Sequence, residues 1–325
     1  MTAPTTGVLE HTIGSTGAFA LNVRSNDVRV VAVDGDSVRI RARDGRDLTR
    51  LDTERGPGLL SVRAGGGVDE LDVDVPRHAT VVIEASSGDI IVRGLRSEQH
   101  YRTSSGDIQL DAVGGRLSAE AVSGDVRIVA SARVEVSART VSGDLAVQAG
   151  AIATLRAVTT SGDLRVAGRF EGEGPFSLET VSGDATLASA GPGLDITVST
   201  ITGDVRSEVE ARQEGPRGQR RLVIGSGSPA LSFRSTSGDL RIARAVPLPI
   251  EAPRPPAPPS APTLEEDAAM STDRLPAADL DVVPDDPELD ILRALERGDI
   301  DVSEATRRLA ALADDPDAGE DDHAG

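Results

Sequence analysis

The sequence predicts an all-β protein built as a β-solenoid, a stack of strand repeats that are each about twenty residues long. Three observations predict this fold: one short motif recurs at nearly equal steps, apolar and polar residues alternate after it, and aromatic residues are scarce. Aromatic residues make up 2% of the chain, with no Trp, one Tyr and four Phe. Burial must therefore come from Val, Ile, Leu and Ala, which suit thin, regular layers.

The recurring motif is Ser or Thr followed by Gly, Asp and an apolar residue. Successive glycines of the motif are 18, 18, 19, 19, 21, 20 and 35 residues apart. The nearly equal steps indicate one structural unit per repeat, and the long last step indicates an insertion. Because glycine adopts corner conformations without a Cβ penalty, these positions are predicted to be structural turns. They are Gly88, Gly106, Gly124, Gly143, Gly162, Gly183, Gly203 and Gly238.

Alternation after the motif predicts strands with one buried face. In the third copy Val126 and Ile128 would point inward and Arg127 outward. A unit of this size cannot bury its own apolar face, but stacked units can, with equivalent strands about 4.8 Å apart. Eight coils would then extend over about 35–40 Å. An antiparallel sandwich of hairpins is the alternative, although it gives no reason for the same tripeptide at each step.

The motif aspartates would form a ladder along the stack. Neighbouring carboxylates in such a ladder repel each other, so a favourable interaction must compensate for this repulsion. The favoured explanation is that Ser and Asp side chains bond backbone donors at the bend. Arginines two residues on could also supply the offset, namely Arg127, Arg165, Arg206 and Arg241. A bound cation is the less favoured explanation, because hard cations prefer carboxylate oxygens. The candidate ladder is Asp89, Asp107, Asp125, Asp144, Asp163 and Asp184, continued by Asp204 and Asp239.

The alternation of apolar and polar residues ends near residue 247. The sequence predicts four segments, of which one precedes this point and three follow it. The strand repeats occupy 1–246, and a Pro-rich acidic linker, expected to be disordered, occupies 247–284. Two short helices are predicted over 285–312, followed by an acidic disordered tail at 313–325. Helices of about ten residues do not persist alone in water, so we expect them to bind a protein partner or to self-associate. Their apolar stripe is Leu289, Leu292, Leu295, Leu309 and Leu312.

Composition narrows the functional classes. The net charge is −19, and the 20 acidic and 5 basic residues of 262–325 account for −15 of it. Because nucleic-acid binding needs a surface rich in basic residues, we do not expect a nucleic-acid partner. The absence of Cys excludes disulfides and thiolate sites. Neither a secretory signal nor an apolar run of about 18 residues is present, so the sequence predicts no transmembrane segment and a cytoplasmic protein.

Catalytic and cofactor motifs are not found. The four histidines are scattered, no H-E-x-x-H or G-x-S-x-G pattern occurs, and the Gly-Ser-Gly at 225–227 lacks the rest of a phosphate loop. His100 and Tyr101 are predicted to be a surface pair. We therefore expect no catalytic residue, no cofactor and no metal site apart from the less favoured ladder.

The long step between repeats supplies the best candidate for recognition. Insertions in solenoids emerge as loops on one face, often the binding face. The interval 207–232 carries a basic cluster, although a solvated hairpin tip is the simpler interpretation. The candidate partner or ligand patch is Arg212, Arg217, Arg220 and Arg221.

The repeats at 86–92, 104–110, 122–128, 142–147, 161–166 and 237–242 resemble the bacterial Toastrack, or "putative adhesin", family of β-strand repeats. This family includes LiaG-like and YvlB-like proteins, and the resemblance covers roughly residues 10–246. The segment "DILRALERGDIDVSEATRRLAAL" is similar to the two-helix module that accompanies this domain in YvlB-like and LiaX-like proteins. The resemblance implies a β-helix-like fold and a link to cell-envelope stress sensing. It carries over no catalytic residues.

Three functional hypotheses follow. The first is a non-enzymatic binding or scaffold protein, in which the solenoid presents repeated polar faces and a tethered helical module binds a partner. The second is a sensor that recognises an envelope-derived or anionic molecule through 207–232. The third and most remote is a carboxylate-based enzyme on a β-helix.

Overall fold

The computed structural model describes residues 7–45, 48, 51–65, 69–216 and 218–244. The chain divides into two compact units, residues 1–256 and 257–325, and all described residues belong to the first. Throughout these ranges the regular structure is β-strand, without an α-helix. The prediction of an all-β solenoid is therefore confirmed. The linker, the two helices with their leucine stripe, and the acidic tail lie outside the described residues.

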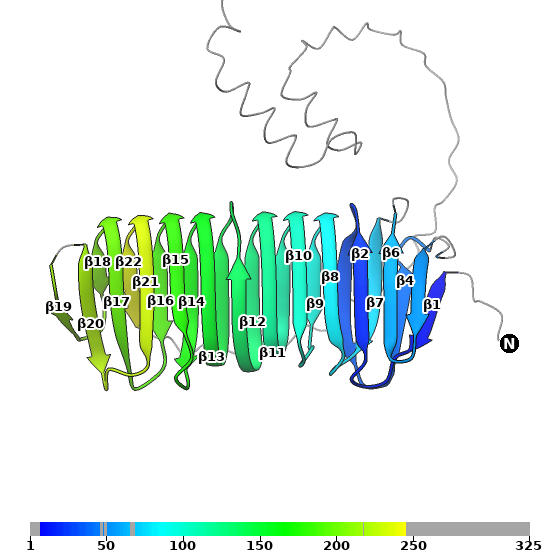
Figure 1. Cartoon of the computed structure of the whole chain (residues 1–325), viewed down its shortest axis with the longest axis horizontal. Coiled ribbons are helices and arrows are strands. Elements are labelled where there is room, and N and C mark those ends of the chain that lie inside the picture. Colours follow the sequence, from blue (N-terminus) through cyan, green and yellow to red (C-terminus); the bar gives the residue numbers. More distant parts are fainter. Residues whose placement is uncertain (1–6, 46–47, 49–50, 66–68, 217, 245–325) are drawn as a thin grey trace, which may run out of the picture. The chain divides into compact units, whose positions relative to one another are not determined.

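The described residues of the first unit form twenty-two strands (Figure 1). Their bounds are β1 Val8–Thr12, β2 Ala18–Val23, β3 Asp27–Val33, β4 Ser37–Ala42, β5 Asp52–Gly56, β6 Leu59–Ala64, β7 Glu70–Pro76, β8 Thr80–Ser87, β9 Ile90–Arg93, β10 Gln99–Ser105, β11 Ile108–Ser123, β12 Val126–Arg139, β13 Leu145–Ser161, β14 Leu164–Phe170, β15 Phe176–Ser182, β16 Ala185–Ser189, β17 Gly193–Thr202, β18 Val205–Ser207, β19 Ala211–Glu214, β20 Gln219–Gly225, β21 Ala230–Ser237 and β22 Leu240–Arg244.

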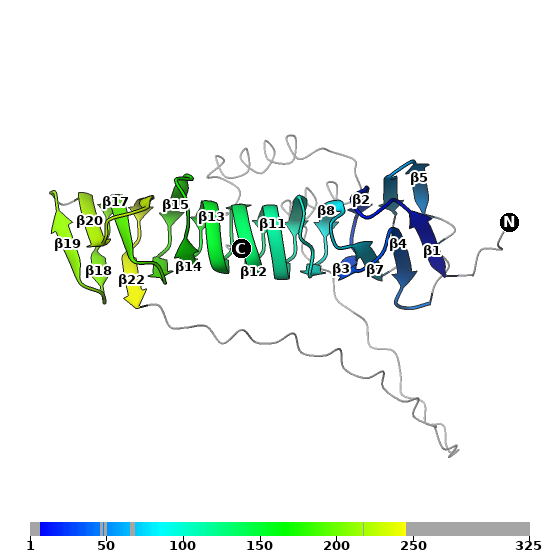
Figure 2. The same ribbon diagram turned by 90° about the horizontal axis from the view of Figure 1, so that it is seen from below.

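The strands form two facing layers, which lie one above the other in the view of Figure 2. Hydrogen-bonded neighbours in the first layer run β5-β6-β2-β8-β10-β11-β12-β13-β15-β21-β17-β20-β19. In the second layer they run β1-β4-β7-β3-β9-β11-β12-β13-β14-β16-β22-β18. The long strands β11, β12 and β13 belong to both layers, because each bends once and continues into the other.

Pairing is parallel throughout the middle of the stack, where each strand lies on its equivalent in the next coil, and the register shifts only where β11, β12 and β13 bend from one layer into the other. Among the strands that the structure describes, antiparallel pairs occur only toward the two ends, between β1, β4 and β7, between β5 and β6, and between β17, β20 and β19. An antiparallel sandwich, the alternative fold, would have antiparallel pairs in the middle as well. Antiparallel strands end the first layer at both ends, at β5 and β19, and the second layer at β1, whereas the second layer ends at its other side with β18, which is paired in parallel with β22.

The core lies between the layers and consists of aliphatic side chains. Val126 and Ile128 are buried, whereas Arg127 between them is exposed. Leu164 and Val166 repeat this pattern in β14. The period-two alternation therefore places one side of each strand in a narrow aliphatic interior.

The repeats predict coils that stack in the order of the sequence. At both ends of the stack the order in space differs from the order along the chain. The last repeat, β21 and β22, lies between β15/β16 and β17/β18. Near the N-terminus the coil of β2 and β3 likewise lies between β6/β7 and β8/β9. Because all coils offer the same hydrogen-bonding edge, a coil can pair between two others that are not both its neighbours in the sequence.

The predicted surface pair of His100 and Tyr101 is wrong for its second member. Tyr101 is 2% exposed, and its hydroxyl donates to Gln99 Oε1 at 3.0 Å. Burial raises the pKa of the Tyr101 hydroxyl well above its ordinary value. His100 lies on the opposite strand face, where its Nε2 is 3.2 Å from Glu98 Oε1. Strand alternation, not the polarity of the tyrosine hydroxyl, decides which of these neighbours is buried.

The described residues include no helix of the length and apolar character that crossing a bilayer requires.

Candidate functional site: the Gly-Asp edge

The aspartates of the repeated motif form a continuous ladder along one edge of the stack. Each carboxylate except that of the last aspartate, Asp204, accepts through Oδ1 the backbone N–H of the aspartate in the next coil. With the acceptor named first, the bonds join Asp27 to Asp89 (2.9 Å), Asp89 to Asp107 (2.9 Å), Asp107 to Asp125 (2.8 Å), Asp125 to Asp144 (2.7 Å), Asp144 to Asp163 (2.9 Å), Asp163 to Asp184 (3.1 Å), Asp184 to Asp239 (2.8 Å) and Asp239 to Asp204 (2.8 Å).

The donors in these bonds are backbone N–H groups that have no acceptor in the hydrogen bonds between neighbouring strands. Neighbouring strands pair through the residue after each aspartate, as when Ile108 N–H donates to the carbonyl of Asp125. The aspartate's own N–H sits at the bend and has no ladder acceptor, so a side chain supplies one. The geometry is that of the favoured explanation, side chains bonding backbone donors at the bend.

The motif glycines lie next to this ladder at a tight corner. At Gly124 φ is +144°, and an added Cβ would lie 2.1 Å from the carbonyl oxygen of Gly106. Both the backbone conformation and the close approach of the next coil therefore require glycine there. The same approach, from 2.0 to 2.3 Å, recurs at all eight predicted corner glycines.

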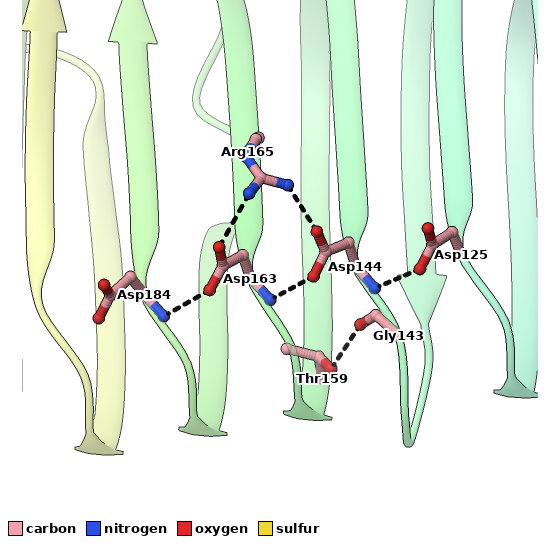
Figure 3. Close-up of polar contacts among 7 residues, drawn as sticks. All are labelled: Asp125, Gly143, Asp144, Thr159, Asp163, Arg165 and Asp184. Atoms are coloured by element: carbon pink, nitrogen blue, oxygen red, sulfur yellow. Dashed lines mark hydrogen bonds and ion pairs between the residues drawn. The ribbon is translucent and has the colours of Figure 1, made fainter.

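One arginine bridges two rungs of the ladder (Figure 3). The Arg165 guanidinium donates to Asp144 Oδ2 at 2.7 Å and to Asp163 Oδ2 at 2.8 Å. The backbone N–H of Asp163, and next the Arg165 guanidinium, hold the pKa of the Asp144 carboxyl below its ordinary value of 3.8. The same contact with Asp144 raises the pKa of Arg165.

The other three arginines predicted to offset the ladder do not do so in the same way. Arg241 donates to Glu208 at the end of the stack. Arg127 and Arg206 are exposed and form no ion pair with any residue in the described ranges. Backbone donors are therefore the general partner of the ladder, and Arg165 is a local addition.

Residues that the motif analysis missed extend the edge. Asp27 adds a ninth carboxylate, and it follows Asn26, which stands where the other coils have glycine. Beneath the corners lie buried hydroxyls, of which Thr140 donates to the Gly124 carbonyl at 3.1 Å and Thr159 to that of Gly143 at 3.3 Å. The Ser-Asn-Asp sequence could have identified Asp27, because its place relative to the following strand matches the motif.

The predicted arginine patch is divided between faces. Arg212 and Arg221 lie on one face of the β19–β20 hairpin, whereas Arg220 lies on the other, beside Leu222. Arg221 forms a bidentate ion pair with Asp195, at 2.9 and 2.6 Å, and this contact lowers the pKa of the Asp195 carboxyl. Arg217 lies outside the described residues. The described part of the interval forms a strand hairpin, β19–β20, which pairs with β17 at the end of the stack. A hairpin is the simpler of the two interpretations of the sequence, and a binding loop that projects from one face is the other.

Within the described ranges no three His, Cys, Asp or Glu side chains are grouped so as to hold a metal ion. The ladder is a single file in which Oδ1 of eight carboxylates is already occupied by a backbone donor. Cation binding by the remaining oxygens stays a prediction.

The fold and the edge together define a parallel β-solenoid whose corners are capped by aspartate side chains. The family model described as Toastrack DUF4097 matches residues 28–243, about two thirds of the chain. The chain belongs to this family.

The solved structures that match the chain include three bacterial proteins of low identity. A "putative adhesin" from Bacteroides fragilis NCTC 9343 is 11% identical, covering 74% of this chain and 98% of that chain at a TM-score of 0.38. A "putative cell adhesion protein" from Clostridium sporogenes ATCC 15579 is 9% identical, covering 74% and 100% at 0.22. A "putative adhesin" from Parabacteroides distasonis ATCC 8503 is 13% identical, covering 73% and 97% at 0.25. No curated protein matches the chain. The family assignment depends on the family model alone.

Proposed function

We propose that this chain is a non-enzymatic binding scaffold, in which the solenoid is a rigid support and the C-terminal segment carries the binding element. One observation supports the proposal most. The repeated polar residues that would be candidates for chemistry are committed to bonds between coils, as when Asp125 Oδ1 accepts the N–H of Asp144. Such an edge stabilises a shape and leaves no converging pair of groups for acid–base catalysis.

The binding element is assigned to 285–312 because short amphipathic helices need a partner. A test substitutes Leu289, Leu292 and Leu295 together by Asp in the full chain and compares co-purified proteins and oligomeric mass with the wild type. The matched control changes polar positions of the same segment, Glu288→Gln and Asp290→Asn. Loss of partners or of self-association in the leucine variant alone would support the proposal. Identical partners and mass in both variants would contradict it.

The alternative, a sensor of anionic molecules at 207–232, has less support. Its three described arginines are divided between the two faces of the hairpin, and Arg221 is already paired with Asp195. A carboxylate enzyme has less support still, because the ladder carboxylates lie in one file and not across a groove.

The cellular setting is part of the proposal. A cytoplasmic protein linked to envelope stress should change in abundance or in its co-purified partners when cells are exposed to a cell-wall inhibitor. Fractionation of such cells, with the tagged wild-type chain followed by immunoblot, tests both points. Recovery outside the cytoplasm, or no response to the inhibitor, would contradict this part and leave the scaffold role standing.

A further inference from the structure

The edge beside the Asp ladder carries a row of exposed aliphatic residues. Among the six large apolar residues that are well exposed in the described ranges, four occupy the same place, two residues before a corner residue of the motif. We call this row the valine ridge: Val122 (55% exposed), Val141 (45%), Val181 (49%) and Ile201 (79%), with Thr160 and Thr236 between them.

The ridge is continuous in space because the coils stack in register. Val141 and Thr160 are neighbours, as their adjacent serines Ser142 and Ser161 show by pairing directly. Ile201 is the neighbour of Thr236, although 35 residues separate them in the sequence. The six positions therefore span five coil steps, about 24 Å.

The fold does not require aliphatic side chains at this place. The equivalent positions of earlier coils hold Ser86 and Ser104, so a polar residue fits there. β-propensity explains why the later positions are β-branched, but Thr160 and Thr236 satisfy it as well as valine does. Exposed aliphatic residues in one line instead mark an interaction surface.

The size of the ridge indicates that its flanks would take part in any stable contact. A specific dimer buries about 800 Å² on each partner, more than a single file of side chains 24 Å long supplies. On one flank lies the Asp ladder. On the other flank, two residues before the ridge positions, Arg139 and Arg234 are exposed and have no ion pair within the described part of the chain.

The charges of the two flanks are complementary to each other. Glu120 and Glu179, which alternate with these arginines, are already paired with Arg102 and Arg156. Arg139 and Arg234 are therefore the free charges of one flank, and the ladder carboxylates are those of the other. A surface whose two sides attract each other is suited to a second copy of itself.

We infer that the valine ridge is the contact surface of a homodimer in which the two solenoids lie side by side with their axes parallel. A two-fold axis along the ridge places Arg139 of each copy opposite Asp144 of the other, and Arg234 opposite Asp239. An axis across the ridge would instead place the two Asp ladders on the same side, where they repel. The charges thus select the parallel arrangement, and this inference does not depend on the proposed function.

The first test is the oligomeric state of the full chain by light scattering at increasing concentration, up to about 100 µM. The wild type should reach the dimer mass. Threonine at Val122, Val141, Val181 and Ile201 should return it to the monomer, while circular dichroism stays unchanged because threonine occurs naturally on this edge. The control replaces two exposed apolar residues elsewhere, Val31→Thr and Leu59→Thr, and should keep the dimer mass.

The second test determines orientation and uses the absence of cysteine from the chain. With parallel axes each ridge residue faces its own equivalent, so Val141→Cys should be joined to itself by a short thiol crosslinker, whereas Val31→Cys should not. Reversal of the free charges, Arg139→Glu with Arg234→Glu, should weaken the dimer by about tenfold or more.

Three results would overturn the inference. If the wild type stays monomeric, the ridge is not a dimer contact and would instead bind residues 245–325 or a different protein. A dimer that survives the four threonine substitutions would place the contact elsewhere. Crosslinking between mixed Val122→Cys and Ile201→Cys chains, without Val141→Cys homodimers, would show antiparallel axes.

Discussion

The carboxylate of Asp107 accepts the backbone N–H of Asp125 at 2.8 Å, although 18 residues separate them in the sequence. The bond joins two coils at a place where the strand ladder provides no acceptor. Replacing Asp107 by Ala should therefore leave this donor without its protein partner and lower the free energy of unfolding by about 1 kcal/mol. Asp107→Asn keeps a carbonyl oxygen in place and should cost less.

The measurement is urea unfolding of both variants, followed by circular dichroism. Because a solenoid need not unfold in one step, midpoints along each transition should be compared rather than a single extrapolated value. Equal losses in the Ala and Asn variants would mean that the carboxylate charge, and not the hydrogen bond, is the stabilising feature.

The corner glycine gives a second prediction. Gly124→Ala would place a Cβ 2.1 Å from the Gly106 carbonyl oxygen in a backbone conformation that alanine rarely adopts. The expected loss of stability is about 2–4 kcal/mol, since both strain and steric overlap are introduced. Gly150→Ala is the matched control, because nothing lies within 4 Å of its added Cβ. Similar thermal midpoints for the two variants would contradict the close packing of the coils.

Much of this edge is predictable from sequence because its causes are local. The geometry of a single corner and of the strand after it determines the residue types at these positions. Gly124, Asp125 and Val126 show this, as the corner glycine, the capping aspartate and the first buried residue of the strand. Any residue set with this spacing makes the same corner, so eight copies identify the stack without knowledge of what each coil contacts.

The order of coils is not predictable in the same way. β21 presents the same backbone edge as β17, so nothing in the pattern of either indicates that β21 pairs with β15. The pairing of Arg221 with Asp195 is hidden for a related reason. It depends on the return of β20 beside β17, which the length of the interval permits but does not specify.

Buried threonines beneath the corners allow a paired test of hydrogen bonding. Thr159 Oγ1 donates to the Gly143 carbonyl, whereas Thr180 Oγ1 is buried without a hydrogen-bond partner in the described structure. Thr159→Val should cost about 1 kcal/mol because a buried bond is lost. Thr180→Val has nearly the same shape and removes an unsatisfied hydroxyl, so it should be neutral or stabilising. The comparison is made by chemical denaturation, and a larger loss at position 180 than at 159 would contradict the assignment.

The bridge between Arg165 and the ladder gives a prediction about pH. The folded-state pKa of Asp144 is held below its ordinary value of 3.8, first by the backbone N–H of Asp163 and then by Arg165. A carboxyl with a lowered folded pKa stabilises the fold above its unfolded pKa, and this contribution disappears as pH falls through the folded value. Arg165→Met removes only the guanidinium's share, so the wild type should exceed the variant in stability at pH 5–7.

The difference between wild type and Arg165→Met should shrink steadily below about pH 4, as Asp144 becomes protonated in both proteins. Urea midpoints at pH 7, 5, 4 and 3 measure it. Arg127→Met is the matched control, because Arg127 follows its aspartate at the same distance and forms no ion pair within the described ranges. It removes a comparable aliphatic stem and should show little dependence on pH. A difference for Arg165→Met that stays constant down to pH 3 would show that the side chain stabilises by packing alone, since packing does not respond to the protonation of Asp144.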